Sequence, residues 1–158
     1  MESPIPPALP QGRRWPPLLA LVLWLGVILG VSSWPRPALP VEPPSFLRQA
    51  LAPTVHFLLY GVLGLLASWA LKRGGPQRIP PLLTVAGVGL FGFLWGMLDE
   101  WYQGFIPGRD SSWGDVAVDV VGAIAGGVAF AWLVARGGRG HLSPQRSAQE
   151  QEHHHRRG

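Results

Sequence analysis

Residues 79–98 read IPPLLTVAGVGLFGFLWGML, a run of 20 residues without Asp, Glu, Lys or Arg. A helix rises about 1.5 Å per residue, so a run of this length can span the roughly 30 Å hydrocarbon core of a bilayer. Further chargeless runs cover residues 15–35, 49–71 and 120–135. Only 14% of the chain is charged, against about 25% in soluble globular proteins. The sequence therefore predicts an all-α integral membrane protein, a four-helix bundle with short loops and disordered polar tails.

Prolines mark the ends of these apolar runs. Pro16, Pro53 and Pro80 each stand just before a predicted span, where proline is tolerated because the N–H groups of a first helical turn are unpaired anyway. We expect the proline-rich residues 35–53 to form an extended, exposed linker. The predicted membrane domain covers residues 16–136, between a polar N-terminal tail at 1–15 and a disordered cytoplasmic tail at 137–158, and its spans lie near 17–34, 54–71, 81–103 and 114–135.

Lys and Arg residues are distributed unevenly around the spans. Ten of the 13 lie before the first span, between the second and third, or after the fourth, whereas Arg36, Arg48 and Arg109 lie in the other two loops. Loops rich in Lys and Arg are retained on the cytoplasmic side of a membrane. We therefore expect both termini to be cytoplasmic, and the loops at 35–53 and 104–113 to face outward.

The first span has an alternative interpretation as a signal peptide. Arg13 and Arg14 precede an apolar stretch at residues 18–31, which is followed by the small residues Ser32 and Ser33. This order of charged, apolar and small residues is also that of a cleavable signal sequence. We favour a retained span, because the later spans already place the chain in the membrane and a tryptophan at position 34 suits an interfacial helix end.

Composition excludes several classes of function. The chain has no cysteine, which excludes disulfides, cysteine zinc sites and a thiol nucleophile. Its basic residues form no aromatic-interleaved patch of the kind that binds nucleic acid, so we expect no nucleic-acid partner. The three histidines at 153–155 lie in the predicted solvated tail, where neighbouring residues seldom form a fixed metal site. The sequence predicts no cofactor and no resident metal.

Glycines spaced four residues apart predict close helix packing. Such a pair lies on one helix face and lets two backbones approach each other closely in lipid. The pairs occur in three spans, at Gly26 and Gly30, Gly92 and Gly96, and Gly122 and Gly126. The expected partner of the bundle is the lipid bilayer, and a homo-oligomer is compatible with the pattern. Transport would need such an oligomer, because four short spans leave little room for a pore.

Ionisable residues gather where the third span ends and the fourth begins. Five of the nine acidic residues fall within the 21 positions from Asp99 to Asp119. Because successive spans run in opposite directions, the start of the second span reaches the same end of the bundle. Three pairs of polar residues spaced four apart, each sharing a helix face, meet at this end. We call the candidate site the polar cluster, and it consists of His56, Tyr60, Asp99, Glu100, Gln103, Arg109, Asp115 and Asp119.

The carboxylates of the polar cluster need compensating partners. We expect Arg109 to be their main counter-ion and His56 the second. Ser112 and Asp115 fit a capping box at the start of the fourth span, in which each side chain bonds the other residue's backbone N–H. A divalent cation would relieve the repulsion among three of the carboxylates, although no recognised metal-binding spacing occurs in the set formed by Asp99, Asp115 and Asp119.

Two segments resemble the VanZ-like family. HFLLYGVLG covers residues 56–64, and DEWYQGFIPGRDSSWGDVAVDVVG covers residues 99–122. The chain departs from the family where Ala52 and Pro53 stand in place of a frequent Asp-Lys pair, and where Asp119 stands in place of a frequent Asn. The residues that match the family pattern are His56, Tyr60, Asp99, Glu100, Gln103, Pro107, Gly108, Arg109 and Asp115.

The resemblance implies a four-span protein of the bacterial cell membrane, in a family named after a protein associated with resistance to the glycopeptide teicoplanin. We expect an outward-facing polar site that binds or modifies a cell-envelope component, with a lipid-linked, glycan or glycopeptide ligand, or that affects glycopeptide antibiotic susceptibility. If the site is enzymatic, His56 or Glu100 is the candidate general base and Arg109 holds an anionic group. The alternative is a non-catalytic membrane scaffold in which the polar cluster is a structural brace.

Overall fold

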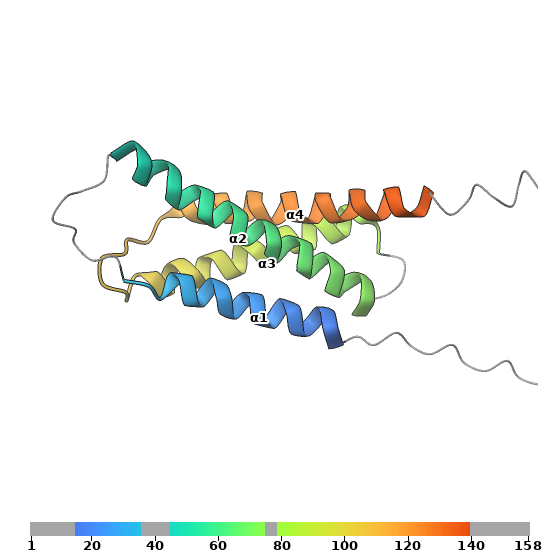
Figure 1. Cartoon of the computed structure of the whole chain (residues 1–158), viewed down its shortest axis with the longest axis horizontal. Coiled ribbons are helices and arrows are strands. Elements are labelled where there is room, and N and C mark those ends of the chain that lie inside the picture. Colours follow the sequence, from blue (N-terminus) through green and yellow to red (C-terminus); the bar gives the residue numbers. More distant parts are fainter. Residues whose placement is uncertain (1–14, 36–44, 75–78, 140–158) are drawn as a thin grey trace, which may run out of the picture.

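The computed structural model describes residues 15–35, 45–74 and 79–139, which form four helices (Figure 1). All four contain a segment long and apolar enough to cross a membrane. The predicted all-α membrane bundle is therefore confirmed. The helices are α1 (Trp15–Ser32), α2 (Ser45–Gly74), α3 (Pro81–Gln103) and α4 (Trp113–Arg139).

The four helices run alternately up and down the bundle (Figure 1). The fourth helix packs along both α2 and α3, while α1 lies against α2 and touches α3. We call the end at which α1 and α3 finish and α4 begins the polar end, which lies at the left of Figure 1. The start of α1 and the end of α4 both lie at the opposite end (Figure 1). The topology thus brings the end of α3 and the start of α4 together, as the candidate site requires.

The second helix differs from the sequence prediction. It begins at Ser45 and contains Pro53, so residues 45–53 are helical and the prediction of an extended linker is wrong there. A proline inside a helix removes only one backbone hydrogen bond, at a cost of about 3 kcal/mol. The residues before it, SFLRQALA, include good helix formers and neither proline nor glycine. The prediction gave too much weight to the single proline at 53.

The outer limits of the bundle also differ slightly from the prediction. The fourth helix continues to Arg139, so residues 137–139 belong to it and not to a tail. The rest of the predicted tails and most of the predicted linker, at residues 1–14, 140–158 and 36–44, lie outside the described residues.

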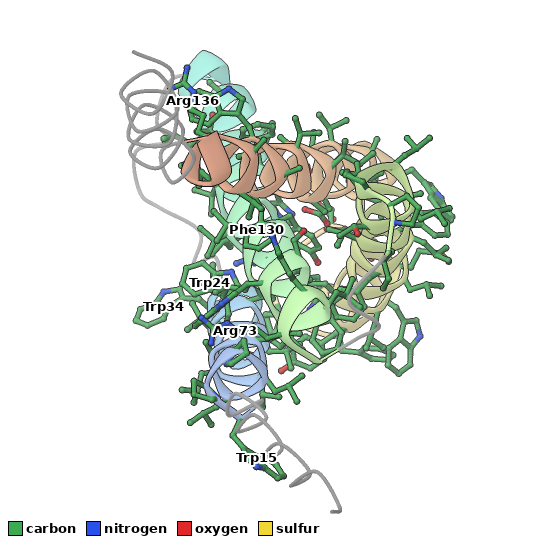
Figure 2. All side chains as sticks on the ribbon, turned by 90° about the vertical axis from the view of Figure 1, so that its right-hand side faces the viewer. Trp15, Trp24, Trp34, Arg73, Phe130 and Arg136 are labelled. Atoms are coloured by element: carbon green, nitrogen blue, oxygen red, sulfur yellow. The ribbon has the colours of Figure 1, made fainter. Side chains whose placement is uncertain are left out.

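The bundle carries its apolar side chains on the outside. Leu19, Leu82 and Leu90 are each more than half exposed, and hydrocarbon side chains cover the outer helix surfaces when the bundle is viewed along its axis (Figure 2). Lipid tails are as apolar as leucine, so these side chains suit a bilayer. The buried residues include Ser32, His56, Ser68, Asp99, Glu100, Gln103 and Asp119.

Close packing of α2 against α4 depends on glycine. A Cβ atom on Gly64 would overlap the backbone of Ala123, and one on Gly126 would overlap the carbonyl oxygen of Gly61. A Cβ atom on Gly122 would lie 2.6 Å from the carbonyl oxygen of Phe57. The prediction of close backbone packing is confirmed for the pair at 122 and 126.

The other two glycine pairs behave differently from each other. A Cβ atom on Gly92 would lie 2.6 Å from the Cβ of Ala123, and one on Gly96 would lie 2.9 Å from Oδ2 of Asp119. This pair therefore brings α3 close to α4, as predicted. A Cβ atom on Gly26 or Gly30 would meet nothing within 4 Å. The prediction is wrong for the α1 pair, which faces away from the other described helices.

Exposed tryptophans lie near both ends of the bundle. Trp34, Trp101 and Trp113 are at the polar end, while Trp15 and Trp132 are at the opposite end. Along α4, Trp113 and Trp132 are 19 residues apart, or roughly 29 Å at 1.5 Å per residue. This separation matches a hydrocarbon core of about 30 Å, at whose boundaries tryptophan is enriched. The polar end therefore lies near one membrane boundary.

Candidate functional site

The helix ends bring the predicted polar cluster together and add one residue to it. Ser32 is the last residue of α1, His56 lies in α2, and Asp99 lies near the end of α3. Asp119 lies in the second turn of α4. All four side chains are buried. Each of the four helices thus contributes a polar group to one place at the polar end.

The pair formed by His56 and Asp119 is a buried contact of the polar cluster. Nδ1 of His56 lies 2.9 Å from Oδ1 of Asp119. Tyr60, one turn further along α2, stacks on the imidazole with the two rings 8° from parallel. The absence of a side chain at Gly96 leaves room for the Asp119 carboxylate. The carboxylate thus pairs with the histidine, which the sequence analysis ranked second to Arg109.

A second set of hydrogen bonds joins α1 to α3. The Ser32 hydroxyl donates to Oδ2 of Asp99 at 2.9 Å, and the Gln103 amide nitrogen donates to the same oxygen at 3.0 Å. The Ser33 and Tyr102 hydroxyls share a hydrogen bond of 2.9 Å. This role of the two serines was not predicted, because in the sequence they fit the small residues of a signal-peptide pattern. The sequence feature that could have indicated this role is a pair of polar residues at the end of an otherwise apolar span.

Arg109 connects the α3–α4 loop to α1 and α3. Gly108, with φ of 75°, adopts the left-handed conformation that favours glycine and turns the chain before this arginine. The guanidinium donates to the carbonyl oxygens of Val31 at 2.7 Å and Trp34 at 3.3 Å, and to Oε1 of Gln103 at 3.0 Å. It therefore caps the carboxyl end of α1, a position that favours a positive charge. It also orients the Gln103 amide, whose nitrogen faces the carboxylates.

The start of α4 is capped in a different way from the prediction. The Ser112 hydroxyl accepts from the backbone N–H groups of Gly114 at 3.1 Å and Asp115 at 3.4 Å, as predicted for an N-cap. The reciprocal bond, however, goes from the Ser112 N–H to Oε2 of Glu100 at 2.6 Å. The predicted capping box with Asp115 is wrong in this half, because a carboxylate from α3 takes the place of the local one.

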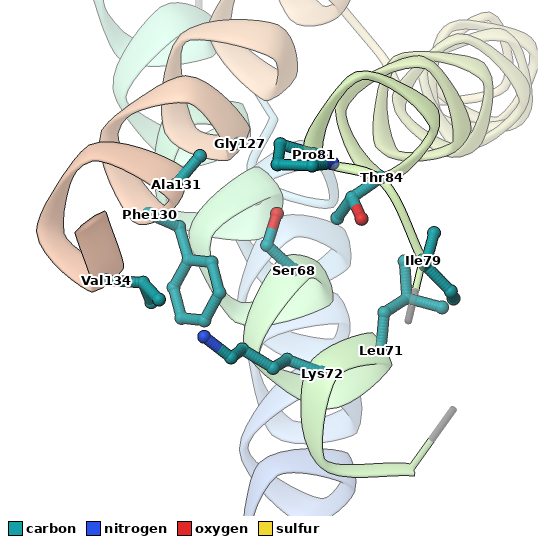
Figure 3. Close-up of a pocket in the computed structure, with 10 residues that line it drawn as sticks. All are labelled: Ser68, Leu71, Lys72, Ile79, Pro81, Thr84, Gly127, Phe130, Ala131 and Val134. Carbon is teal, nitrogen blue, oxygen red and sulfur yellow. The ribbon is translucent and has the colours of Figure 1, made fainter. Parts of the chain in front are cut away.

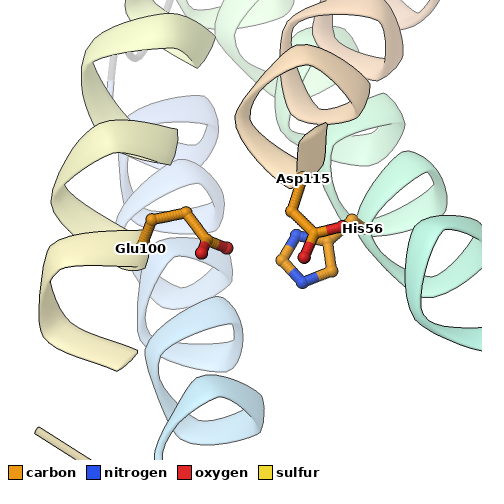
Figure 4. Close-up of side chains that lie close together, drawn as sticks. All are labelled: His56, Glu100 and Asp115. Carbon is orange, nitrogen blue, oxygen red and sulfur yellow. The ribbon is translucent and has the colours of Figure 1, made fainter. Parts of the chain in front are cut away.

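The Asp115 carboxylate instead lies near two other groups. His56, Glu100 and Asp115 come from α2, α3 and α4 (Figure 4), and one ligand-type atom from each lies within 4.8 Å of the others. The carboxylates expected from the sequence to suit a cation are a different set, Asp99, Asp115 and Asp119, and no resident metal is predicted from the sequence. The structure shows a mixed set of one imidazole and two carboxylates.

A cavity of about 220 Å³ opens beside the polar cluster. Its apolar wall includes Leu51, Val55 and Leu59, and its polar wall includes His56, Tyr60, Asp99 and Arg109. Oδ1 of Asp99 and the hydroxyl of Tyr60 are buried and have no hydrogen-bond partner among the described residues. Buried polar groups are nearly always hydrogen-bonded in folded proteins. Two residues with an unpartnered polar atom therefore line the cavity, next to a cation and an apolar surface.

Two more cavities lie elsewhere in the bundle. One of about 210 Å³ lies near the opposite end, where Phe130, Ala131 and Val134 of α4 face Leu71 and Lys72 of α2 (Figure 3). The described residues that line it include no acidic side chain. Another, of about 270 Å³, lies at the polar end and is lined by Met97, Glu100, Trp101, Ser111, Ser112, Trp113 and Val116. Glu100 thus borders a cavity on the side of α3 and α4.

Comparison with known proteins gives one match. The family described as VanZ/LLP1 matches residues 18–134. This range contains nearly all of the four helices and every residue of the polar cluster. The curated proteins and the solved structures give no match.

Proposed function

This chain belongs to the VanZ/LLP1 family and is an integral membrane protein, and from that premise we propose that its polar cluster binds the headgroup of an amphipathic cell-envelope component. The observation that carries the proposal is the cavity of about 220 Å³ with one apolar and one polar wall. An amphipathic molecule presents the same two kinds of surface. Its chain would lie along Leu51, Val55 and Leu59, and its headgroup would meet His56, Asp99 and Arg109.

The charged groups of the cavity suggest the chemistry of the headgroup. Arg109 offers a planar donor group that suits phosphate or carboxylate oxygens. The unpartnered Oδ1 of Asp99 accepts a hydrogen bond from a hydroxyl, amide or amine. A lipid-linked glycan precursor combines all of these groups, and a glycopeptide carries the last three. These are the ligand classes that we propose.

The orientation of the bundle supports access from outside the cell. Lys72, Arg73 and Arg136 lie at the helix ends opposite the polar end, and in the sequence ten of the 13 basic residues precede the first predicted span, lie between the second and third, or follow the fourth. Basic residues are retained in the cytoplasm. We propose that the polar end faces outward in a bacterial cell membrane, where it meets envelope components and affects glycopeptide susceptibility.

A structural brace is the second candidate, because the polar groups also bond one another. Arg109 contacts Gln103, Gln103 contacts Asp99, and Asp99 contacts Ser32. This chain of hydrogen bonds joins α1, α3 and the α3–α4 loop. A brace would need no cavity and no ligand, so blocking the cavity separates the two functions.

The experiment fills the cavity without removing any polar group. Ala52 lines the cavity on α2 and makes no side-chain hydrogen bond, so Ala52→Phe narrows the cavity and leaves the brace intact. Ala117, exposed on α4, provides the matched control as Ala117→Phe. The full chain in lipid nanodiscs is titrated with a polyprenyl phosphate, with and without an attached sugar, and with teicoplanin.

We expect Ala52→Phe to weaken binding of at least one of these probes by about tenfold or more, with Tm unchanged, and Ala117→Phe to bind normally. In cells, Ala52→Phe should also remove any shift in glycopeptide susceptibility. Equal binding by both variants, or no binding of any probe by the parent chain, would contradict the ligand site. Retention of the susceptibility shift in Ala52→Phe would favour the brace.

A further inference from the structure

Three helices present metal-ligand side chains to one another at the polar end (Figure 4). His56, Glu100 and Asp115 each offer an atom, and these atoms lie within 4.8 Å of one another. An ion with bonds of about 2.0–2.2 Å holds its ligand atoms roughly 3–4 Å apart. Rotation of the Asp115 side chain, which is partly exposed in the first turn of α4, would shorten these distances.

The imidazole is held as in many metal sites. Its Nδ1 is engaged by Oδ1 of Asp119 at 2.9 Å, which leaves Nε2 as the atom for an ion. Metal-bound histidines commonly donate their second ring N–H to a carboxylate, which fixes the tautomer and the ring orientation. Tyr60 adds to this by stacking on the ring. Asp119 is thus a positioning residue, placed behind the ligand histidine.

Charge at the polar end favours a dication. When the four carboxylates of Asp99, Glu100, Asp115 and Asp119 are ionised and His56 is neutral, as a metal ligand must be, Arg109 supplies one positive charge. Three negative charges are left over, and a divalent cation would balance two of them. A charge that no opposite charge balances has a high free-energy cost within the membrane. Oδ2 of Asp119 is buried and has no hydrogen-bond partner among the described residues.

We infer that His56, Glu100 and Asp115 bind a divalent first-row transition-metal ion, oriented by Asp119. One imidazole nitrogen and two carboxylate oxygens suit Zn²⁺, whereas Mg²⁺ prefers oxygen ligands alone. Three protein ligands leave one tetrahedral position open. The same His56 lines the cavity of the proposed headgroup site, and the cavity beside Glu100 provides a route for the ion. This inference goes beyond the proposed function and does not require a lipid ligand.

The experiment measures metal binding by the full chain with the other four histidines removed. His141, His153, His154 and His155 are the only histidines besides His56, so replacing them with alanine removes binding by the tail. The chain is purified without an affinity tag, treated with a chelator and titrated with Zn²⁺ in detergent, without added lipid. Absorption of bound Co²⁺ and electron paramagnetic resonance of bound Cu²⁺ then report whether a histidine nitrogen coordinates the ion.

We expect one Zn²⁺ per chain, and about a tenfold or larger loss of affinity in Asp115→Asn, Glu100→Gln and His56→Gln. Asp110→Asn, an exposed residue of the α3–α4 loop, is the matched control and should bind Zn²⁺ normally. The Cu²⁺ spectrum should show one coordinating nitrogen in the parent and none in His56→Gln. Asp119→Asn should weaken binding and keep the one-nitrogen spectrum.

A folding defect is separated from a lost ligand by the effect of Zn²⁺ on Tm. Zn²⁺ should raise Tm of the parent and of Asp110→Asn, but not that of Asp115→Asn. The Asp115 side chain is partly exposed, so of the ligand variants Asp115→Asn should disturb folding least. The inference is overturned when the parent binds no stoichiometric Zn²⁺, or when Asp115→Asn binds as tightly as the control. Headgroup binding measured in excess chelator is a separate result, so either proposal can fail without the other.

Discussion

Nδ1 of His56 and Oδ1 of Asp119 lie 2.9 Å apart although 63 residues separate them in the chain. The contact is possible because α2 and α4 approach closely at glycines 61, 64, 122 and 126, and because Gly96 of α3 leaves space for the carboxylate. The packing of small residues in the membrane core therefore fixes the geometry of the polar groups at its end. Stability and site chemistry share the same contact surface.

Removal of the Asp119 carboxylate should destabilise the bundle strongly. Asp119→Ala leaves a buried imidazole without its partner, which typically lowers the free energy of unfolding by about 3 kcal/mol or more. Asp119→Asn should lower it by only about 1 kcal/mol, because the amide oxygen still accepts a hydrogen bond from Nδ1. Unfolding by denaturing detergent in mixed micelles measures both values. Asp110→Ala, on the exposed loop, should stay within about 0.5 kcal/mol, and equal losses in all three variants would contradict the buried pair.

A methyl group at Gly126 should separate α2 from α4. The added Cβ atom would overlap the carbonyl oxygen of Gly61, and backbone cannot rotate away as a side chain can. We expect Gly126→Ala to lower the free energy of unfolding by about 3 kcal/mol, at the upper end of typical overpacking costs. The control is Gly30→Ala, which meets nothing within 4 Å and should leave stability unchanged or raise it by up to about 1 kcal/mol. Similar Tm values for the two variants would rule out the tight α2–α4 contact.

A lysine cannot replace Arg109. The guanidinium reaches the Val31 and Trp34 carbonyls and the Gln103 side chain at once, whereas a lysine ammonium is a compact charge that lacks the planar fork. Arg109→Lys should therefore lower the free energy of unfolding by about 2 kcal/mol. Arg136→Lys, at the exposed end of α4, should cost about 0–1 kcal/mol. Chemical unfolding of the two variants side by side measures the difference, and an Arg109→Lys chain as stable as the parent would remove the capping role.

The fold could be predicted largely from the distribution of charge. Four runs without charged residues predict four helices, because a helix that spans a bilayer needs mainly a long apolar segment. The start of α2 could not be predicted, because the helix formers at residues 45–52 and the proline at 53 give opposite local signals. The sequence also could not show that Gly26 and Gly30 face away from the other helices, because identical spacing carries no information about helix rotation.

The members of the polar cluster could be predicted, but their pairing could not. Helical spacing and alternating direction place the side chains at one end of the bundle. Which carboxylate meets His56, and which one caps Ser112, depends on helix rotations of a few tens of degrees. Glu100 replaces Asp115 at the cap for this reason, and Asp115 is then left near His56. Ser32 joins the cluster because α1 ends level with Asp99.

The polar end should be reached by reagents applied outside the cell. The chain has no cysteine, so a single introduced cysteine gives an unambiguous signal. Asp110→Cys, on the exposed α3–α4 loop, should react with an impermeant thiol reagent on intact cells, whereas Gly138→Cys, at the far end of α4, should react only after lysis. The reverse pattern would invert the proposed orientation and place the polar cluster in the cytoplasm.

Glu100→Gln separates the electrostatic role of Glu100 from its capping role. The glutamine oxygen can still accept from the Ser112 N–H, which lies 2.6 Å from Oε2, so the start of α4 should stay anchored to α3. The negative charge is lost, and with it one of the carboxylates that face His56. A hydrogen bond to a charged group is stronger than one to a neutral group, and the free energy of unfolding should therefore fall by about 1 kcal/mol.

The matched variant Glu100→Ala removes both roles and should lower the free energy of unfolding by about 2–3 kcal/mol, because the Ser112 N–H loses its acceptor. Thermal unfolding of the two variants, measured beside probe binding or antibiotic susceptibility, distinguishes the functions. A headgroup site at His56 predicts that Glu100→Gln, which removes a carboxylate facing His56, loses more binding than stability. A pure brace predicts that the two properties fall in proportion, with Glu100→Gln mildly and Glu100→Ala strongly affected in both.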